Sequence, residues 1–240
     1  KYMNKKILFI GANGYMGYGM AQNLLKQNTV FIYPNKNKDN IKKLLNLGAK
    51  EIRSYDEIKK LKLDCLMLCV TNTPIAIDIA KKIAPQLNNS SLVIDLTTHN
   101  KNGTNEMKNI FDKYDISFVV SPVMGSKKES ELGILGSIWG GDDNKFEESK
   151  IYLNTFCKNI FNFGSVEKAC AAKLLSNFLS LLTTTTVIEY FKSADKLNID
   201  IRKLFEVAKL GSGNSAALDR IAEKAISGDY KGYTFSVSTT

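Results

Sequence analysis

The sequence predicts an α/β fold, a doubly wound parallel sheet followed by an all-α second domain that the chain enters through one long helix. Two observations predict the sheet. Short apolar runs of strand length alternate with segments of helical periodicity over roughly the first 160 residues, and a glycine-rich turn joins the first strand to the first helix. A third observation, the unbroken helical pattern from Val166 to about Leu197, predicts the long helix. We therefore place a sheet domain at residues 1–164 and an all-helical domain at residues 165–240.

The first strand, residues 7–10, runs into three glycines spaced three apart, Gly11, Gly14 and Gly17, and a segment of helical periodicity follows. Such a turn leaves backbone N–H groups and the positive end of the helix dipole facing a gap, which suits a dinucleotide pyrophosphate. The spacing departs from the usual G-x-G-x-x-G, and similar turns also occur in plain strand–helix connections. On the dinucleotide interpretation, the cofactor-binding residues of the turn are Gly11, Ala12, Asn13, Gly14, Tyr15 and Met16.

The later strands of the sheet are continuous apolar runs, as expected of parallel strands that are covered on both faces. Helical segments separate them, which implies right-handed crossovers. The predicted strands are residues 29–33, 64–70, 91–96 and 116–120, with candidate edge strands at 135–139 and 161–163. The predicted helices are 41–47, 56–61, a helix that begins near Pro74, 105–113, and, in the second domain, 166–197, 201–210 and 216–225.

Composition narrows the classes of function. The chain is 44% hydrophobic and 24% charged, as in an ordinary globular protein. No apolar run approaches the roughly 18 residues of a membrane helix and no signal-peptide layout is present, so we predict a cytoplasmic protein with no membrane partner. The net charge of +9 comes from dispersed lysines, typical of a solvated surface, and no nucleic-acid motif is present. The four cysteines lack metal-ligand spacing and are interpreted as buried apolar residues.

The carboxyl ends of the predicted strands carry polar residues, and ligands of open parallel sheets bind at these ends. Lys173 and Asn177 are the strongest candidates for chemistry because they lie four residues apart on one face of the long helix. A lysine can protonate a carbonyl oxygen as hydride reaches the carbon. Alternatively, Lys173 extends along an apolar helix with its charge in water. His99, the chain's one histidine, is a candidate base or a structural residue.

Four stretches of the chain carry motifs of one known family in the family's order. Residues 14–24 read G-Y-M-G-Y-G-M-A-Q-N-L, and residues 95–98 read D-L-T-T. Residues 122–135 contain P-V-M-G-S-K-K followed by a glutamate, a glycine and a leucine, and residues 173–177 read K-L-L-S-N. Together these stretches resemble the β-hydroxyacid dehydrogenases, the family of 3-hydroxyisobutyrate dehydrogenase. The third resembles the glyoxylate and succinic semialdehyde reductase branch.

The resemblance implies a Rossmann sheet and an NAD(P)H-dependent enzyme that reduces a small aldehyde or keto acid, such as glyoxylate or succinic semialdehyde, to the hydroxy acid. Lys173 is then the general acid/base. The implied substrate-binding residues are Thr98, Met124, Gly125, Ser126 and Asn177, and the cofactor would also contact Asn35, Lys36, Val70, Thr71 and Thr98. The resemblance further implies a homodimer or homotetramer that packs through the long helix. Family members continue for about 50 residues beyond the position of Thr240, so the second domain is either incomplete here or short.

Several residues depart from the family's pattern and leave alternatives open. Met124 stands where the family has a serine, and Glu167 and Ala169 replace glycines before the lysine. A member of the family that binds NADPH with weak or no catalysis is therefore the alternative function. Among related enzymes, 6-phosphogluconate dehydrogenases would have a histidine where Ser176 stands, and imine reductases usually lack the lysine.

The cofactor preference depends on the end of the second strand. An acid there would bind the ribose 2′-hydroxyl of NAD, whereas a basic residue accommodates the 2′-phosphate of NADP. The segment after Tyr33 has no acid; it has Asn35, where the branch commonly has an arginine, followed by Lys36 and Lys38. We predict NADP, with NAD as the alternative.

Overall fold

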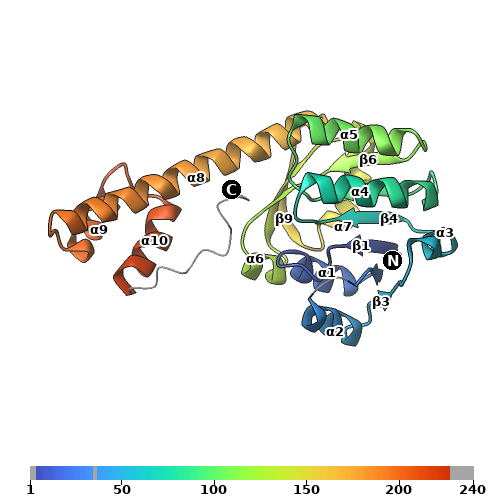
Figure 1. The fold of residues 1–240 in the computed structure, drawn as a ribbon, viewed down its shortest axis with the longest axis horizontal. Helices are drawn as coiled ribbons and strands as arrows, with labels where there is room; N and C mark the ends of the chain where they lie inside the picture. Colours follow the sequence, from blue (N-terminus) through green and yellow to red (C-terminus); the bar gives the residue numbers. More distant parts are fainter. Residues whose placement is uncertain (1–3, 35–36, 228–240) are drawn as a thin grey trace. The chain divides into compact units, whose positions relative to one another are not determined.

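The computed structural model describes residues 4–34 and 37–227 (Figure 1). The chain forms two compact units, Lys1–Leu174 and Leu175–Thr240. The division between the two units falls after Leu174, inside the long helix α8 (Val166–Lys196). The domain boundary predicted from the sequence lies just before this helix.

The first unit is built on a six-stranded parallel sheet with the strand order β3-β2-β1-β4-β5-β6. The chain moves outward from β1 in one direction and then returns to place β4 on the other side of β1, so the order reverses between these two strands. This is the doubly wound arrangement that the sequence predicts. The strands are β1 (Lys6–Ile10), β2 (Thr29–Ile32), β3 (Lys50–Glu51), β4 (Cys65–Leu68), β5 (Leu92–Asp95) and β6 (Ser117–Val120).

Helices connect the strands as expected. Asn37, Asn72 and Asn100 each accept a backbone N–H at the start of a helix, which sets where α2, α4 and α5 begin. Helix α5 therefore starts four residues before the predicted helix at 105–113. The connecting helices are α1 (Gly17–Leu25), α2 (Lys38–Asn46), α3 (Ile58–Leu61) after the 3₁₀ turn η1 (Tyr55–Glu57), α4 (Thr73–Ile83) followed by η2 (Ala84–Gln86), and α5 (Lys101–Asp112).

A smaller sheet, ordered β7-β8-β9, follows β6. The predicted edge strand at 135–139 is β8 (Leu135–Trp139), and the one at 161–163 is the end of β9 (Cys157–Asn162). β7 (Val123–Met124), α6 (Lys127–Leu132), η3 (Asp143–Lys145) and α7 (Phe146–Leu153) were not expected from the sequence. The one tryptophan, Trp139, is fully buried, and its indole Nε1–H donates to Ser149 Oγ at 3.0 Å.

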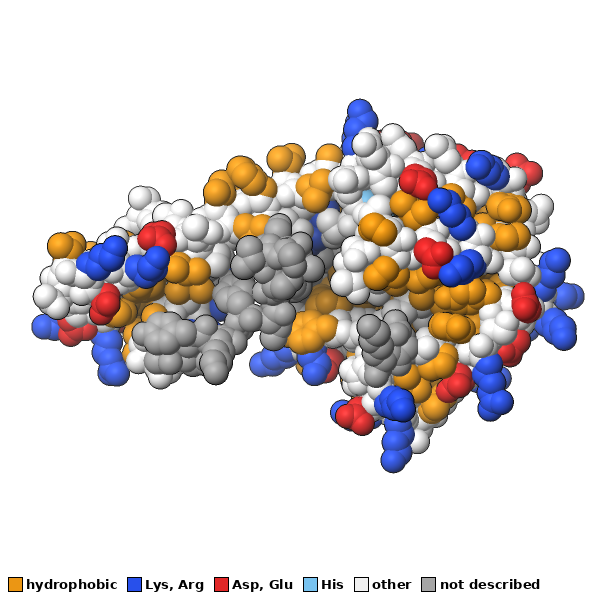
Figure 2. Space-filling model, in the orientation of Figure 1, with side chains coloured by type: hydrophobic (Ala, Val, Ile, Leu, Met, Phe, Trp, Pro, Cys, Tyr) orange, Lys and Arg blue, Asp and Glu red, His pale blue; other side chains and the backbone are white. Residues whose placement is uncertain are grey.

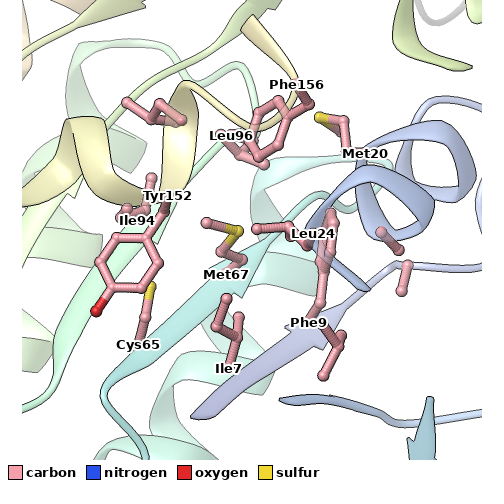
Figure 3. Packing of buried hydrophobic residues seen from close by; sticks show 14 of the residues in the cluster. Ile7, Phe9, Met20, Leu24, Cys65, Met67, Ile94, Leu96, Tyr152 and Phe156 are labelled. Carbon is pink, nitrogen blue, oxygen red and sulfur yellow. The ribbon is translucent and has the colours of Figure 1, made fainter. Parts of the chain in front are cut away.

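Both faces of the main sheet are buried. The side chains of β4 alternate between them: Cys65 and Met67 pack with α1 and α7, and Leu66 and Leu68 pack with α4 and α5. Figure 3 shows the first face, where Met20 and Leu24 of α1 lie near the strand residues. The sheet therefore holds the ends of its strands in fixed positions.

The cysteines behave mainly as the sequence predicts. All four are free thiols, and Cys65, Cys157 and Cys170 are buried. Burial raises the pKa of Cys157 to about 12, so this thiol stays protonated at neutral pH. Cys69 is half-buried.

The second unit is helical, as predicted. It contains the remainder of α8, α9 (Ile201–Leu210) and α10 (Ala216–Ser227). A small apolar core joins α8 to α10 through Val187, Phe191, Leu218 and Ala222.

Helix α8 corrects one expectation. An 18-residue window of it has a mean hydropathy of 1.2, so by length and composition alone it is the one helix among the described residues that could cross a membrane. The sequence shows no unbroken apolar run because Thr183 to Thr186 interrupt it, yet threonine lowers the average only slightly. Only 11% of the window is buried, and Figure 2 shows apolar side chains along this helix. One such helix does not by itself indicate a membrane span.

Candidate functional site

The glycine turn between β1 and α1 requires the absence of side chains at two positions. Gly11 has a φ of +90°, and a Cβ there would lie 2.0 Å from the carbonyl oxygen of Cys69. A Cβ on Gly17 would lie 2.0 Å from the carbonyl oxygen of Gly11. The Gly14 N–H closes the turn by donating to the same oxygen at 2.9 Å. The backbone of the turn therefore packs directly against itself and against the backbone at the end of β4.

The start of α1 favours an anion. Met16 occupies the N-cap position and makes no side-chain cap hydrogen bond, and the first turn of α1 contains no acidic residue. Helix N-termini carry backbone N–H groups without intrahelical partners and a partial positive charge. This end of α1 thus presents the features to which phosphates bind.

A cavity of about 470 Å³ lies beside the turn, at the carboxyl ends of β1, β2 and β4. Six of the residues predicted to contact the cofactor line it: Gly11, Asn13, Gly14, Tyr15, Val70 and Thr71. Ala12 is buried, and neither it nor Met16 lines the cavity.

The cavity also includes residues that the sequence analysis did not select. Tyr33 and Tyr55 pack together with their ring centroids 4.7 Å apart, and Ile75 and Ile79 of α4 add an apolar wall. Tyr33 ends the second predicted strand and could have been chosen on that ground. Tyr55 lies in a polar segment with no distinguishing signal.

Asn13 fixes the turn to the start of α2. Its side-chain amide donates to the carbonyl of Asn37 at 3.5 Å, and its own carbonyl accepts from the side chain of Asn40 at 3.1 Å. Lys38, the first residue of α2, is exposed. Asn35 and Lys36, both predicted to contact the cofactor, lie outside the described residues.

The ends of β4 and β5 are joined by a buried polar network. Asp95, fully buried, accepts the Thr97 N–H at 2.9 Å, and its other oxygen lies 2.8 Å from His99 Nε2. The Val70 N–H donates to Thr97 Oγ1 at 3.1 Å. The structural interpretation of His99 thus agrees with its burial, while Thr98 is half-buried beside it.

The loop predicted to hold the substrate follows β6. Met124 is half-buried, and Gly125 has a φ of +131°. Ser126 caps α6: its N–H donates to Glu129 Oε2 at 2.7 Å, and its hydroxyl accepts the Glu129 N–H at 3.4 Å. The polar groups of Ser126 are therefore already engaged within its own helix.

Helix α6 holds this loop against the glycine turn. Ser130 Oγ donates to the carbonyl of Met16 at 2.7 Å, and the amide of Asn23 donates to the carbonyl of Ser130 at 3.0 Å. Above this contact, Lys127 Nζ lies 6.0 Å from the ring centroid of Tyr15. Two predicted parts of the site, the turn and the loop, are thus brought together.

Lys173 lies on α8 within the first unit and is half-buried. Burial lowers the pKa of its ammonium group. One turn earlier, Cys170 is buried in the apolar cluster that also contains Met107 and Phe111 of α5. This stretch of α8 is therefore packed in the core of the first unit. Asn177, also half-buried, belongs to the second unit.

Comparison with known proteins adds to this geometry. The profile of a family described as the NAD binding domain of 6-phosphogluconate dehydrogenase matches residues 6–164. A probable mitochondrial 3-hydroxyisobutyrate dehydrogenase of Dictyostelium discoideum is 28% identical over 207 residues, which make up 84% of this chain and 63% of that protein. The chloroplastic glyoxylate/succinic semialdehyde reductase 2 of Arabidopsis thaliana is 27% identical, over 86% of this chain and 58% of that protein.

Among solved structures, 3-hydroxyisobutyrate dehydrogenase of Mycobacterium tuberculosis, determined with L-serine, superposes with a TM-score of 0.80. The match covers 90% of this chain and 73% of that one, at 21% identity, and supports the fold. The chain spans about three fifths of the length of the two curated relatives above.

Proposed function

The chain belongs to the β-hydroxyacid dehydrogenase family, and from that premise we propose that it is an NAD(P)H-dependent reductase of a small aldehyde or keto acid. In this proposal Lys173 is the general acid/base. The observation that carries it is the half-buried lysine itself, whose pKa is lowered by burial, one helical turn after Cys170 on the part of α8 that packs in the core of the first unit.

The residues present fit a dinucleotide. The close approach of Gly11 and Gly17 to neighbouring backbone leaves the start of α1 open to a pyrophosphate, and the cavity beside it has the volume of a small-molecule site. The bound cofactor supplies hydride to the carbonyl carbon of the substrate. The apolar wall of Ile75 and Ile79 and the Tyr33–Tyr55 pair would hold the adenosine part away from water.

Lys173 would supply the proton. As the carbon–oxygen π bond breaks, the substrate oxygen takes a proton from the lysine ammonium and becomes the hydroxyl group of the product. The amine then regains its proton from water. A pKa lowered by burial brings this lysine closer to the pH at which an acid of this kind transfers protons efficiently.

The substrate carboxylate would be held by Thr98 and by backbone N–H groups of the loop at residues 122–126. The family resemblance also assigns Asn177 to the substrate, and this residue follows Lys173 by one turn of α8. Because Ser126 caps α6, its N–H and hydroxyl contribute less than the sequence implies. Met124 in place of a serine offers the carboxylate no hydroxyl, and its side chain packs beside Gly136 and against the apolar core.

We propose NADP as the preferred cofactor. The described end of β2 offers no carboxylate for a ribose 2′-hydroxyl, since Tyr33 and Pro34 stand there. Lys38 is exposed at the start of α2, close in sequence to the strand end, although Asp39 follows it. In the sequence, residues 36–39 carry two lysines, Lys36 and Lys38, against one acid, Asp39, which favours a 2′-phosphate.

We also propose that the protein forms a homodimer or homotetramer through α8. Three apolar side chains of this helix are more than half exposed among the described residues: Leu175, Phe178 and Leu179. Exposed apolar surface of this kind marks interaction sites, and soluble assemblies are mostly symmetric copies of one chain.

The test of the catalytic proposal is the oxidation of NADPH, followed by absorbance, with glyoxylate, succinic semialdehyde or methylmalonate semialdehyde, and with NADH in parallel. We expect turnover of one of these acids and its loss in Lys173→Ala. Lys168→Ala removes a more exposed lysine of the same helix and serves as the control. Full turnover by Lys173→Ala would overturn the assigned role. Tight NADPH binding without any turnover would favour a cofactor-binding protein instead.

A further inference from the structure

We propose that His99 is a positioning residue whose two ring nitrogens tie together the loops after β4 and β5, and so hold the nicotinamide end of the dinucleotide site in its binding geometry. The inference rests on the proposed function. It assigns His99 to that site, whereas the sequence analysis gave this residue as either a candidate base or a structural residue.

The imidazole is buried and bridges two loops. Its Nε2 lies 2.8 Å from Asp95 Oδ2, at the end of β5, and its Nδ1 lies 2.9 Å from Thr73 Oγ1, at the start of α4. A carboxylate has no proton to donate, so Nε2 carries the ring proton. In the neutral ring, Nδ1 then accepts the hydroxyl proton of Thr73. Both ring nitrogens are therefore satisfied: Asp95 holds the ring at the end of β5, and Thr73 joins it to the start of α4.

Both loops belong to the site. The loop after β4 carries Val70 and Thr71, which line the cavity, and the loop after β5 carries Thr98. The Val70 N–H donates to Thr97 Oγ1, which is a second tie between them. The imidazole thus acts with the Val70–Thr97 bond and with the Leu96 N–H, which donates to the Leu68 carbonyl at 2.8 Å, to fix the backbone of Val70 relative to Thr98.

The strand order places these loops at one end of the site. Adenosine is recognised at the end of β2, and β1 and β4 lie between β2 and β5. A dinucleotide that starts at β2 and crosses the glycine turn therefore reaches the β4 and β5 loops with its nicotinamide half. Loosening the bridge should affect that half more than the adenosine half.

The same side-chain types form the Ser–His–Asp arrangement that activates a hydroxyl in hydrolases. Here that role has no support, because Thr73 does not line the cavity beside the glycine turn. Its methyl group instead packs against α5, where a Cβ on Gly103 would lie 2.4 Å from it. The hydroxyl of Thr73 faces the imidazole rather than a space for substrate.

The test compares three variants. Thr73→Val keeps the shape of the side chain and removes one bond of the bridge; His99→Leu removes both. His99→Gln is the rescue variant, because the amide oxygen and nitrogen can replace the two ring nitrogens. Calorimetric titration measures the affinity for NADPH and NADH, and for ADP and 2′-phospho-ADP, which lack the nicotinamide half.

We expect Thr73→Val to weaken NAD(P)H binding by about fivefold and His99→Leu by more, the size of effect that one lost hydrogen bond produces. The affinity for ADP or 2′-phospho-ADP should stay within about twofold of wild type, a margin well inside one hydrogen bond. His99→Gln should bind NAD(P)H nearly as wild type does.

Wild-type NAD(P)H affinity in Thr73→Val, or an equal loss for the nucleotides without nicotinamide, would overturn the inference. If His99→Leu fails to fold, Thr73→Val and His99→Gln decide the question. A wild-type protein that binds neither NADPH nor NADH would overturn the proposed function itself, a result distinct from the first two.

Discussion

The burial of Lys173 lowers its pKa from the usual value of 10.5, and the direction of that change fixes how the reaction should depend on pH. In the proposed mechanism, reduction consumes the ammonium form of Lys173. Its rate is therefore level below the pKa of Lys173 and falls by about tenfold for each further pH unit above it.

We thus expect the decline of NADPH-dependent reduction to begin below pH 10.5, while the reverse oxidation, which needs the neutral amine, rises over the same range. Initial rates in both directions across a pH series measure this. The Lys168→Ala control should keep the wild-type profile, and a reduction rate that stays level up to pH 10.5 would contradict the assignment.

A substitution at Gly11 tests whether the close backbone packing of the turn contributes to stability. Gly11→Ala places a Cβ 2.0 Å from the Cys69 carbonyl oxygen and also occupies a left-handed φ. We expect a loss of roughly 3 kcal/mol or more in the free energy of unfolding, measured in urea by circular dichroism. Gly48→Ala is the matched control, because Gly48 has a φ of +98° with nothing within 4 Å of the added Cβ. It should cost about 1 kcal/mol. Equal losses would mean that the backbone contact is not limiting.

At the scale of elements, the docking of α6 onto α1 depends on a buried amide. Asn23 donates to the carbonyls of Gly19 and Ser130, and its side chain is buried. Asn23→Ala leaves the Ser130 carbonyl without this donor. We expect a loss of about 1–3 kcal/mol in the free energy of unfolding, whereas Gln22→Ala, at a half-buried neighbouring position of α1, should stay within about 0.5 kcal/mol. Similar losses in both variants would show that α6 is held by packing alone.

The elements that the sequence predicts best are those whose own residues carry the signal. Apolar runs such as 64–70 are buried on both faces, so they identify the parallel strands directly, and the glycine turn has a shape that few other residues permit. The helices α6 and α7 are different. α6 has only six residues, and its start is encoded in the reciprocal capping of Ser126 and Glu129, a local signal that the motif at 122–126 obscured.

The residues of the candidate site also differ in whether the sequence carries a signal for them. The sequence marks Lys173, Val70 and the turn because each stands in a pattern along the chain. It cannot mark Tyr55 or the bridge from His99 to Thr73, since those contacts join residues that are distant in sequence and have no periodicity. The polar groups of Ser126 are another example, because only the structure shows that α6 already uses them.

At the scale of the whole molecule, the apolar side chains of α8 lead to a prediction about assembly. We expect light scattering to give the mass of a dimer or tetramer. Leu179→Lys, which places a charge where the side chain is 67% exposed, should shift the distribution toward the monomer. Lys192→Ala, a polar position of the same helix, is the control. A monomeric wild-type protein would contradict the proposal.

The fluorescence of Trp139 allows the unfolding of the first unit to be followed separately. Because it is the single tryptophan and lies buried in β8, selective excitation of its indole reports the state of the first unit alone. Far-ultraviolet ellipticity reports the helices of both. If the indole emission shifts to the red at one denaturant concentration and the helical signal is lost at another, the two units melt independently. A single chromophore therefore allows the cooperativity between the units to be measured without any label.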